Sequence, residues 1–162
     1  MIVKVKKVHP SAKLPYKASE GAVGFDVYAF SYEYDYEHKT HIYRTGICIE
    51  MPDDVECQIR PRSSIYKVDA IMTNSVGTVD PDYRGELILT FKNYNELSII
   101  NSIINRFLVW LGLRKPANRT PYAIGERIGQ LVFNKIERPC FVESNELSPT
   151  NRGEGGHGST GK

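Results

Sequence analysis

Apolar and polar side chains alternate with a period of two in several runs along the chain. In the longest such run, 28–37, each even position carries an aromatic side chain and each odd position a smaller or polar one. This period of two is typical of strands that bury one face. Shorter runs follow at 47–51, 55–59, 87–91 and 131–133. Many short strands separated by turns predict an all-β fold of the sandwich or jelly-roll type.

One segment departs from this alternation. Between 96 and 111 the apolar residues are spaced three or four apart, which is the spacing of one face of an α-helix. Asn95 is a suitable N-cap, and Gly112 can end the helix. The pattern predicts an inserted amphipathic helix over 96–111, followed by a basic loop, so that the whole insert covers 96–118.

The composition is typical of one globular domain. The chain has 162 residues, of which 41% are hydrophobic, and its net charge of +2 does not indicate a basic nucleic-acid-binding face. The N-terminus lacks the apolar run of a signal peptide, and the apolar stretch near 97–113 is too interrupted to span a membrane. We therefore expect a cytoplasmic protein with no nucleic-acid partner and no membrane span.

Neither cysteine nor histidine is spaced as a metal ligand would be. Cys48, Cys57 and Cys140 are odd in number and far apart, so small buried thiols are expected rather than disulfides. The four histidines do not pair with one another, or with cysteine or carboxylate, at a ligand spacing, and a zinc site is not expected.

The segment 151–162 differs in composition from the single domain predicted for 1–150. It is rich in glycine and has no aliphatic or aromatic residue, so by itself it buries too little surface to offset its ordering entropy. Composition alone favours a frayed terminus. The run 156–162 lacks the preceding strand and following helix of a P-loop. Glycine with Ser and Thr can still wrap N–H groups around a bound phosphate.

Two internal segments carry side chains suited to a phosphorylated ligand. In 61–64, the fork of Arg62 can bind phosphate oxygens while two serines add donors. In 74–86, Gly77 permits a close approach of the backbone to a ligand, and a turn carries Asp80. Each feature alone is common on protein surfaces, where such residues are usually solvated.

Taken together and in order, five segments resemble the motifs of the trimeric deoxyuridine triphosphatases (dUTPases). The segments are 24–29, 61–64, 77–86, 125–132 and 152–161, and they span nearly the whole chain. The resemblance implies a dUTPase-like jelly-roll or β-clip fold. It also implies a homotrimer with active sites between subunits and a flexible C-terminal arm, 151–162, that closes over them.

The activity that the resemblance implies is hydrolysis of dUTP to dUMP and pyrophosphate. This reaction keeps uracil out of DNA and supplies dUMP for dTMP synthesis. Asp80 is the implied catalytic residue, which activates the water that attacks the α-phosphorus. Mg²⁺ is the implied cofactor, held mainly by the substrate phosphates and water without a direct protein ligand.

The resemblance also assigns substrate contacts. Asn74 and the backbone around 77–80 would read uracil, Tyr83 would pack under the deoxyribose, and the arm would close on the β- and γ-phosphates. The expected substrate-binding residues are Arg62, Ser63, Ser64, Asn74, Gly77, Thr78, Val79, Tyr83, Ile88, Gln130, Arg152, His157, Gly158, Ser159 and Thr160.

Two departures from the family pattern lead to separate hypotheses. His157 stands where the family usually has a Phe that stacks on uracil, and a ring with a pKa near neutrality predicts a weaker or pH-sensitive lid. The insert 96–118 makes the connection before the fourth motif longer than the family pattern implies. We interpret it as a helix packed on the trimer surface; docking of another protein, or membrane contact through Trp110 and Arg114, is the alternative.

Two other functions compete with dUTP hydrolysis. A dCTP deaminase would share the fold and the Arg-Ser-Ser segment, but Thr90 stands where such an enzyme would carry its catalytic Glu. A dUTPase with an added regulatory, protein-binding role through the insert is the second alternative.

Overall fold

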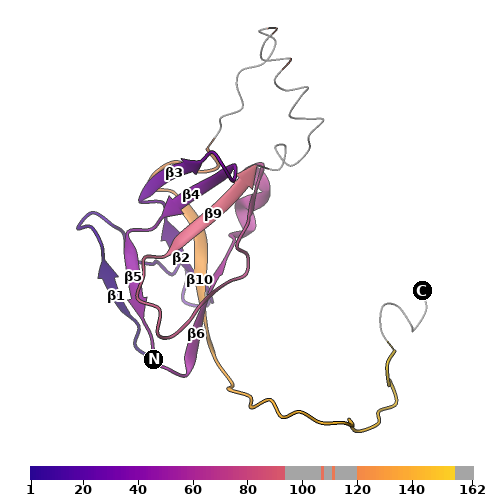
Figure 1. Ribbon diagram of the computed structural model, residues 1–162. Helices are drawn as coiled ribbons and strands as arrows, with labels where there is room; N and C mark the ends of the chain where they lie inside the picture. The colour runs from indigo at the N-terminus through magenta and orange to yellow at the C-terminus, as the bar shows by residue number, and fades with distance from the viewer. Residues whose placement is uncertain (94–106, 108–110, 112–119, 156–162) are drawn as a thin grey trace.

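Ten strands and one short 3-10 helix make up the part of the chain described by a computed structural model, residues 1–93, 107, 111 and 120–155 (Figure 1). The predicted all-β fold is confirmed. In chain order the elements are β1 (Lys4–Lys7), β2 (Phe25–Tyr28), β3 (Ser31–Asp35), β4 (Thr40–Arg44), β5 (Ile47–Glu50), β6 (Val55–Arg60), η1 (Ser63–Lys67), β7 (Ala70–Met72), β8 (Gly77–Val79), β9 (Ile88–Asn93) and β10 (Arg127–Lys135).

The strands form three antiparallel sheets. β1 pairs with β5, a second sheet has the order β2-β10-β6-β8, and a third has the order β3-β4-β9-β7. In the second sheet the central position next to β2 and β6 belongs to β10, the last strand described. Residues from opposite ends of the chain therefore become neighbours there.

The core takes side chains from all three sheets. Ile47 of β5, Leu131 of β10 and the aromatic rings of Tyr43 and Phe91 are each at most 1% exposed. Packing between β9 and β10 is close. A Cβ on Gly129 would lie 2.3 Å from Cδ2 of the fully buried Leu89.

The alternation at 28–37 predicts one strand, but the structure divides it between two sheets. β2 and β3 are separated by Ala29 and Phe30. The Ala29 N–H donates to the carbonyl of Glu126 (2.9 Å), whereas the Phe30 N–H donates to the carbonyl of Arg44 in β4 (2.8 Å). The prediction of a single strand is wrong, because these bonds transfer the chain from the second sheet to the third.

The predicted insert lies almost wholly outside the described residues. Within 96–118 only Phe107 and Leu111 are described, and the Leu111 N–H donates to the Phe107 carbonyl (3.0 Å). No α-helical element occurs in 1–93 or 120–155, and the predicted helix over 96–111, which lies outside these ranges, is not borne out. In the described part of the chain, no helix is long and apolar enough to cross a membrane.

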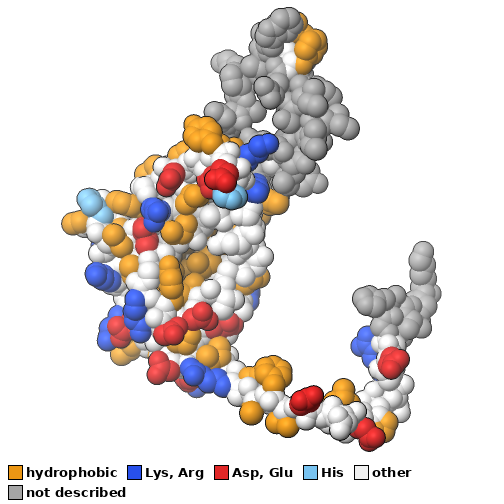
Figure 2. Space-filling view, viewed as in Figure 1, with side chains coloured by type: hydrophobic (Ala, Val, Ile, Leu, Met, Phe, Trp, Pro, Cys, Tyr) orange, Lys and Arg blue, Asp and Glu red, His pale blue; other side chains and the backbone are white. Residues whose placement is uncertain are grey.

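After β10 the chain leaves the sheets as an extended arm, residues 136–155 (Figures 1 and 2). Near its start, Arg138 donates to the carbonyl of Asp53 (2.6 Å). Further along, Phe141, Val142 and Leu147 are 93%, 82% and 89% exposed. The arm thus begins ahead of residue 151 and carries apolar side chains that its own chain does not cover.

Candidate active site

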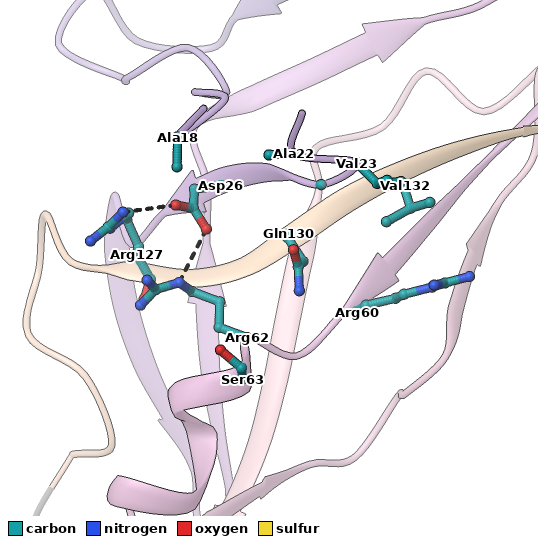
Figure 3. Close-up of a pocket in the computed structure, with 11 residues that line it drawn as sticks. Ala18, Ala22, Val23, Asp26, Arg60, Arg62, Ser63, Arg127, Gln130 and Val132 are labelled. Atoms are coloured by element: carbon teal, nitrogen blue, oxygen red, sulfur yellow. Dashed lines mark hydrogen bonds and ion pairs between the residues drawn. The ribbon is translucent and has the colours of Figure 1, made fainter. Parts of the chain in front are cut away.

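Most of the predicted site residues line one of two cavities, and no residue lines both. The first, here called the arginine cavity, has a volume of about 440 Å³ (Figure 3). The second, here called the β8–β9 cavity, has a volume of about 190 Å³. The arginine cavity is lined by Ala18, Ala22, Val23, Gly24, Asp26, Arg60, Arg62, Ser63, Arg127, Gln130 and Val132. The β8–β9 cavity is lined by Ile59, Asn74, Gly77, Thr78, Val79, Asp80, Tyr83, Glu86, Leu87 and Ile88.

A row of polar side chains crosses the second sheet beneath the arginine cavity. Gln130 of β10 is the register partner of Asp26 in β2 and of Arg60 in β6. Register partners project from the same face of a sheet, so the three side chains share one face. The amide of Gln130 also donates to the carbonyl of Pro61 (3.1 Å), which ties it to the segment that carries Arg62.

The carboxylate of Asp26 holds two of the three arginines of this cavity. Its Oδ1 accepts from Nε of Arg62 (3.1 Å) and its Oδ2 from Nη1 of Arg127 (2.9 Å), as the dashed lines in Figure 3 show. Its side chain is only 12% exposed. Arg60 instead bonds the side-chain oxygen of Gln58. Three guanidinium groups against one carboxylate leave the cavity positively charged and suited to an anion such as phosphate.

The β8–β9 cavity lies at the turn that joins β8 to β9. Asn74 is held there by Thr90, whose backbone N–H (3.4 Å) and hydroxyl (3.2 Å) both donate to its side-chain oxygen. Asp80 is exposed and begins the turn. Its carboxylate has no hydrogen bond or ion pair with any residue that the structure describes. It is therefore open to a water molecule or a ligand in this cavity.

Most of the predicted site residues line one of the two cavities. Arg62, Ser63 and Gln130 meet in the arginine cavity, and seven others meet in the β8–β9 cavity: Asn74, Gly77, Thr78, Val79, Asp80, Tyr83 and Ile88. Ser64 lines neither cavity; its hydroxyl accepts from Nη1 of Arg62 (3.2 Å). Arg152 lies on the arm, where it donates to the carbonyl of Gly155 (2.7 Å). The predicted lid residues His157, Gly158, Ser159 and Thr160 lie outside the described residues.

Three charged residues of the arginine cavity are absent from the predicted site residues, although two of them lie in the motif-like segments 24–29 and 125–132. They are Asp26, Arg60 and Arg127. Asp26 carries a local signal, because it stands between Phe25 and Val27 in a half-buried strand, where a carboxylate needs a partner. The partners, by contrast, are recognisable only once the β2-β10-β6 pairing is known.

The described residues offer no cluster of protein ligands for a metal ion. No group of three or more His, Cys, Asp or Glu side chains close enough to hold a metal occurs in the ranges that the structure covers. In the arginine cavity, Asp26 is the one lining carboxylate, and both its oxygens accept from arginines.

Comparisons with known proteins point to one family. The family model described as dUTPase matches residues 10–106. The deoxyuridine 5'-triphosphate nucleotidohydrolase of Helicobacter pylori strain J99 is 33% identical, over 99% of this chain and 97% of the relative. The enzyme of that name from Thermoanaerobacter sp. strain X514 is 40% identical, over 99% of this chain and 98% of the relative.

Solved structures of phage dUTPases share the fold. The Staphylococcus bacteriophage 80alpha dUTPase with dUpNHpp has a TM-score of 0.71 and 21% identity, and the match covers 99% of both chains. A mutant dUTPase from phage phi11 of S. aureus, described as revealing the coordination of a structural Mg(II) ion, has a TM-score of 0.66 and 16% identity. That match covers 92% of this chain and 100% of the phage protein.

Proposed function

Because the chain belongs to the dUTPase family, we propose that it hydrolyses dUTP to dUMP and pyrophosphate and that Asp80 activates the attacking water. The observation that carries the role of Asp80 is its position: it is exposed on the turn at the β8–β9 cavity, and its carboxylate has no partner among the described residues. Water loses a proton to Asp80 as its oxygen attacks the α-phosphorus, and the bond from that phosphorus to the oxygen bridging to the β-phosphate breaks. A positioned base of this kind contributes roughly 100- to 10,000-fold.

The two cavities hold different parts of the substrate in this proposal. Uracil and deoxyribose occupy the β8–β9 cavity, where Asn74 and the backbone of β8 face the base and Tyr83 lies under the sugar. The triphosphate occupies the arginine cavity, where Arg62 and Gln130 stabilise the charge that develops on the leaving pyrophosphate. Ser64 acts there through its hydrogen bond with Arg62.

The sheet itself supports active sites shared between subunits. Ile59 lines the β8–β9 cavity, and the next residue of β6, Arg60, lines the arginine cavity. Successive residues of a strand point to opposite faces, so the second sheet separates the two cavities. One nucleotide cannot reach both within a single chain. A homotrimer in which the β8–β9 cavity of one subunit faces the arginine cavity of another removes this obstacle.

The arm fits the same assembly. The arm, which includes Arg152, runs away from the sheets of its own chain (Figure 1), and its exposed apolar residues need a partner surface. We assign it to a neighbouring subunit, where Arg152 and the lid residues 157–160 close on the phosphates.

Magnesium fits this site as a companion of the substrate. The described residues supply no ligand cluster, and the carboxylate of Asp26 is already engaged by Arg62 and Arg127. Mg²⁺ keeps most of its waters and binds substrate phosphates readily. When bound, it would neutralise phosphate charge, and Arg62 and Arg127 would orient the phosphates from the protein side.

Pyrophosphate release from dUTP, compared with dCTP, dTTP and UTP in the presence of Mg²⁺, tests the proposed function. Rapid release from dUTP alone is expected. Ammonia release from dCTP would instead identify a deaminase. The structure already gives Thr90 a different task, since its hydroxyl bonds Asn74 and that of Thr73 (2.7 Å).

A further inference from the structure

The side chain of Tyr83 folds back over the turn that carries it. Its hydroxyl donates to the carbonyl of Glu86 (3.2 Å), and its backbone N–H donates to the carbonyl of Asp80 (3.1 Å). The residue is 45% exposed and lines the β8–β9 cavity. One turn thus presents both the proposed base and the aromatic ring proposed to lie under the sugar.

Gly85 leaves the space that this ring occupies. A Cβ at Gly85 would lie 2.3 Å from the hydroxyl oxygen of Tyr83 and 2.4 Å from its Cζ, distances that no side chain tolerates. Gly85 is not among the glycines with positive φ, so its backbone conformation is open to alanine. The obstacle to a larger residue is the ring itself, which can rotate away while the backbone stays in place.

Contacts of the Glu86 side chain fix the position of the backbone carbonyl that accepts from the Tyr83 hydroxyl. Its carboxylate is 17% exposed and accepts from the backbone N–H of Gly46 (2.7 Å) and from Nη1 of Arg44 (3.3 Å). The next residue, Leu87, is 1% exposed and donates to the carbonyl of Ile47 (2.9 Å). The carbonyl that receives the Tyr83 hydroxyl is therefore anchored to the start of β5, outside the cavity.

We propose that Gly85 and Glu86 are positioning residues that set the discrimination between deoxyribose and ribose. The proposal rests on the proposed function, in which Tyr83 lies under the sugar. A ring that fills the space left open at Gly85 and is held at its hydroxyl by the Glu86 carbonyl keeps one position, and that position leaves no room for a 2′-hydroxyl. A ring displaced by a side chain at position 85, or released at its hydroxyl, leaves that position, admits the 2′-hydroxyl and packs less well on deoxyribose.

The first test is Gly85→Ala, with kcat and KM measured for dUTP and for UTP. We expect the ratio of kcat/KM for dUTP to that for UTP to fall at least tenfold, mainly because KM for dUTP rises and UTP becomes a substrate. The melting temperature should change little, since the ring moves and the backbone does not. Gly21→Ala is the matched control: nothing lies within 4 Å of its added Cβ, so the ratio should be unchanged.

A double-mutant cycle with Tyr83→Ala separates positioning from a general loss of structure. If Gly85 acts through the ring, Tyr83→Ala and the double variant will have the same dUTP-to-UTP ratio. An unchanged ratio in Gly85→Ala, or an equal further fall when Tyr83 is already Ala, would overturn the role of Gly85.

Glu86→Ala should lower the ratio as Gly85→Ala does, and Glu86→Gln should restore most of it, because an amide oxygen can still accept from the Gly46 N–H. Wild-type discrimination in Glu86→Ala would exclude Glu86 from the proposal. Failure of the proposed function is distinguishable from either result, because the wild-type protein itself would then release no pyrophosphate from dUTP.

Discussion

At the scale of single residues, two carboxylates near the proposed reaction have opposite surroundings. Asp26 is nearly buried and accepts hydrogen bonds from two guanidinium groups. Asp80 is exposed, with a carboxylate that no described residue bonds. Both oxygens of Asp26 are occupied by arginines, whereas the carboxylate of Asp80 is open to a water molecule beside a cavity, as a general base must be. Asp26 is therefore best understood as the group that aims Arg62 and Arg127.

Replacing Asp80 with Asn preserves the shape of the side chain and removes its ability to take a proton. We expect kcat for dUTP to fall by at least about 100-fold. The dissociation constant of a non-hydrolysable dUTP analogue, measured by calorimetry, should change little. Asp82→Asn is the control, because Asp82 lies in the same turn and lines neither cavity. An equal loss of turnover in both variants would contradict the assignment.

Asp35, at the turn between β3 and β4, should make the stability of the fold depend on pH. The backbone N–H of His38 (2.9 Å), and then its ring, bond the carboxylate and lower the pKa of Asp35 below its ordinary value of 3.8. A group whose pKa is lower in the folded than in the unfolded chain stabilises the fold at pH values above its unfolded pKa. This contribution is lost as the pH falls through the folded pKa. Asp35→Asn should thus be less stable than wild type in urea at pH 7, and the difference should shrink below about pH 3.8. A difference independent of pH would contradict this origin.

At the scale of elements, the contact between β9 and β10 has no spare volume. An added methyl at Gly129 would meet Leu89 and lie 3.2 Å from the carbonyl of Arg60, which is backbone and cannot rotate away. Gly129→Ala should therefore lower the free energy of unfolding by about 1–3 kcal/mol. Urea denaturation measures this loss. Gly21→Ala is the control, because it is the same substitution at a position where nothing lies within 4 Å of the added Cβ. Equal stability of the two variants would show that the sheets can separate locally.

Alternation along the sequence predicted strands well where one face of the strand is buried. Val55, Cys57 and Ile59 of β6 are all buried, as the period of two requires. The same signal failed at 28–37, because alternation reports burial and carries no information about which strand is the neighbour. For this reason, too, the ion pair of Asp26 with Arg127 was missed: it depends on the pairing of β2 with β10, which begin 102 residues apart.

The motif residues show what sequence reasoning could and could not predict about the site. The resemblance placed Arg62 and Gln130 in one phosphate site, and the structure brings both into the arginine cavity. It grouped Asp80 with them, yet within one chain Asp80 lines the other cavity. The order of the motifs along the chain identifies which residues serve a site, whereas the structure shows which of the two cavities each residue lines.

At the scale of the whole molecule, the proposed trimer predicts complementation between two inactive variants. Asp80→Asn damages only the β8–β9 cavity, and Arg62→Ala damages only the arginine cavity. Equal amounts refolded together should regain roughly a quarter of wild-type turnover, the random chance that one intact cavity of each kind meets at an interface. Pyrophosphate release measures the gain, with each variant refolded alone as the control. No gain in trimers that have demonstrably mixed would contradict active sites shared between subunits.

Two cavities on opposite faces of one sheet also affect how a loss-of-function mutation would behave when a normal copy of the protein is present. In the proposed trimer each chain takes part in one site through its β8–β9 cavity and in another through its arginine cavity. A copy damaged in both would silence the sites on either side of it in any mixed assembly. A cell that expressed such a copy beside a sound one would lose more activity than the defective share alone, so the mutation would behave as dominant although it merely removes function.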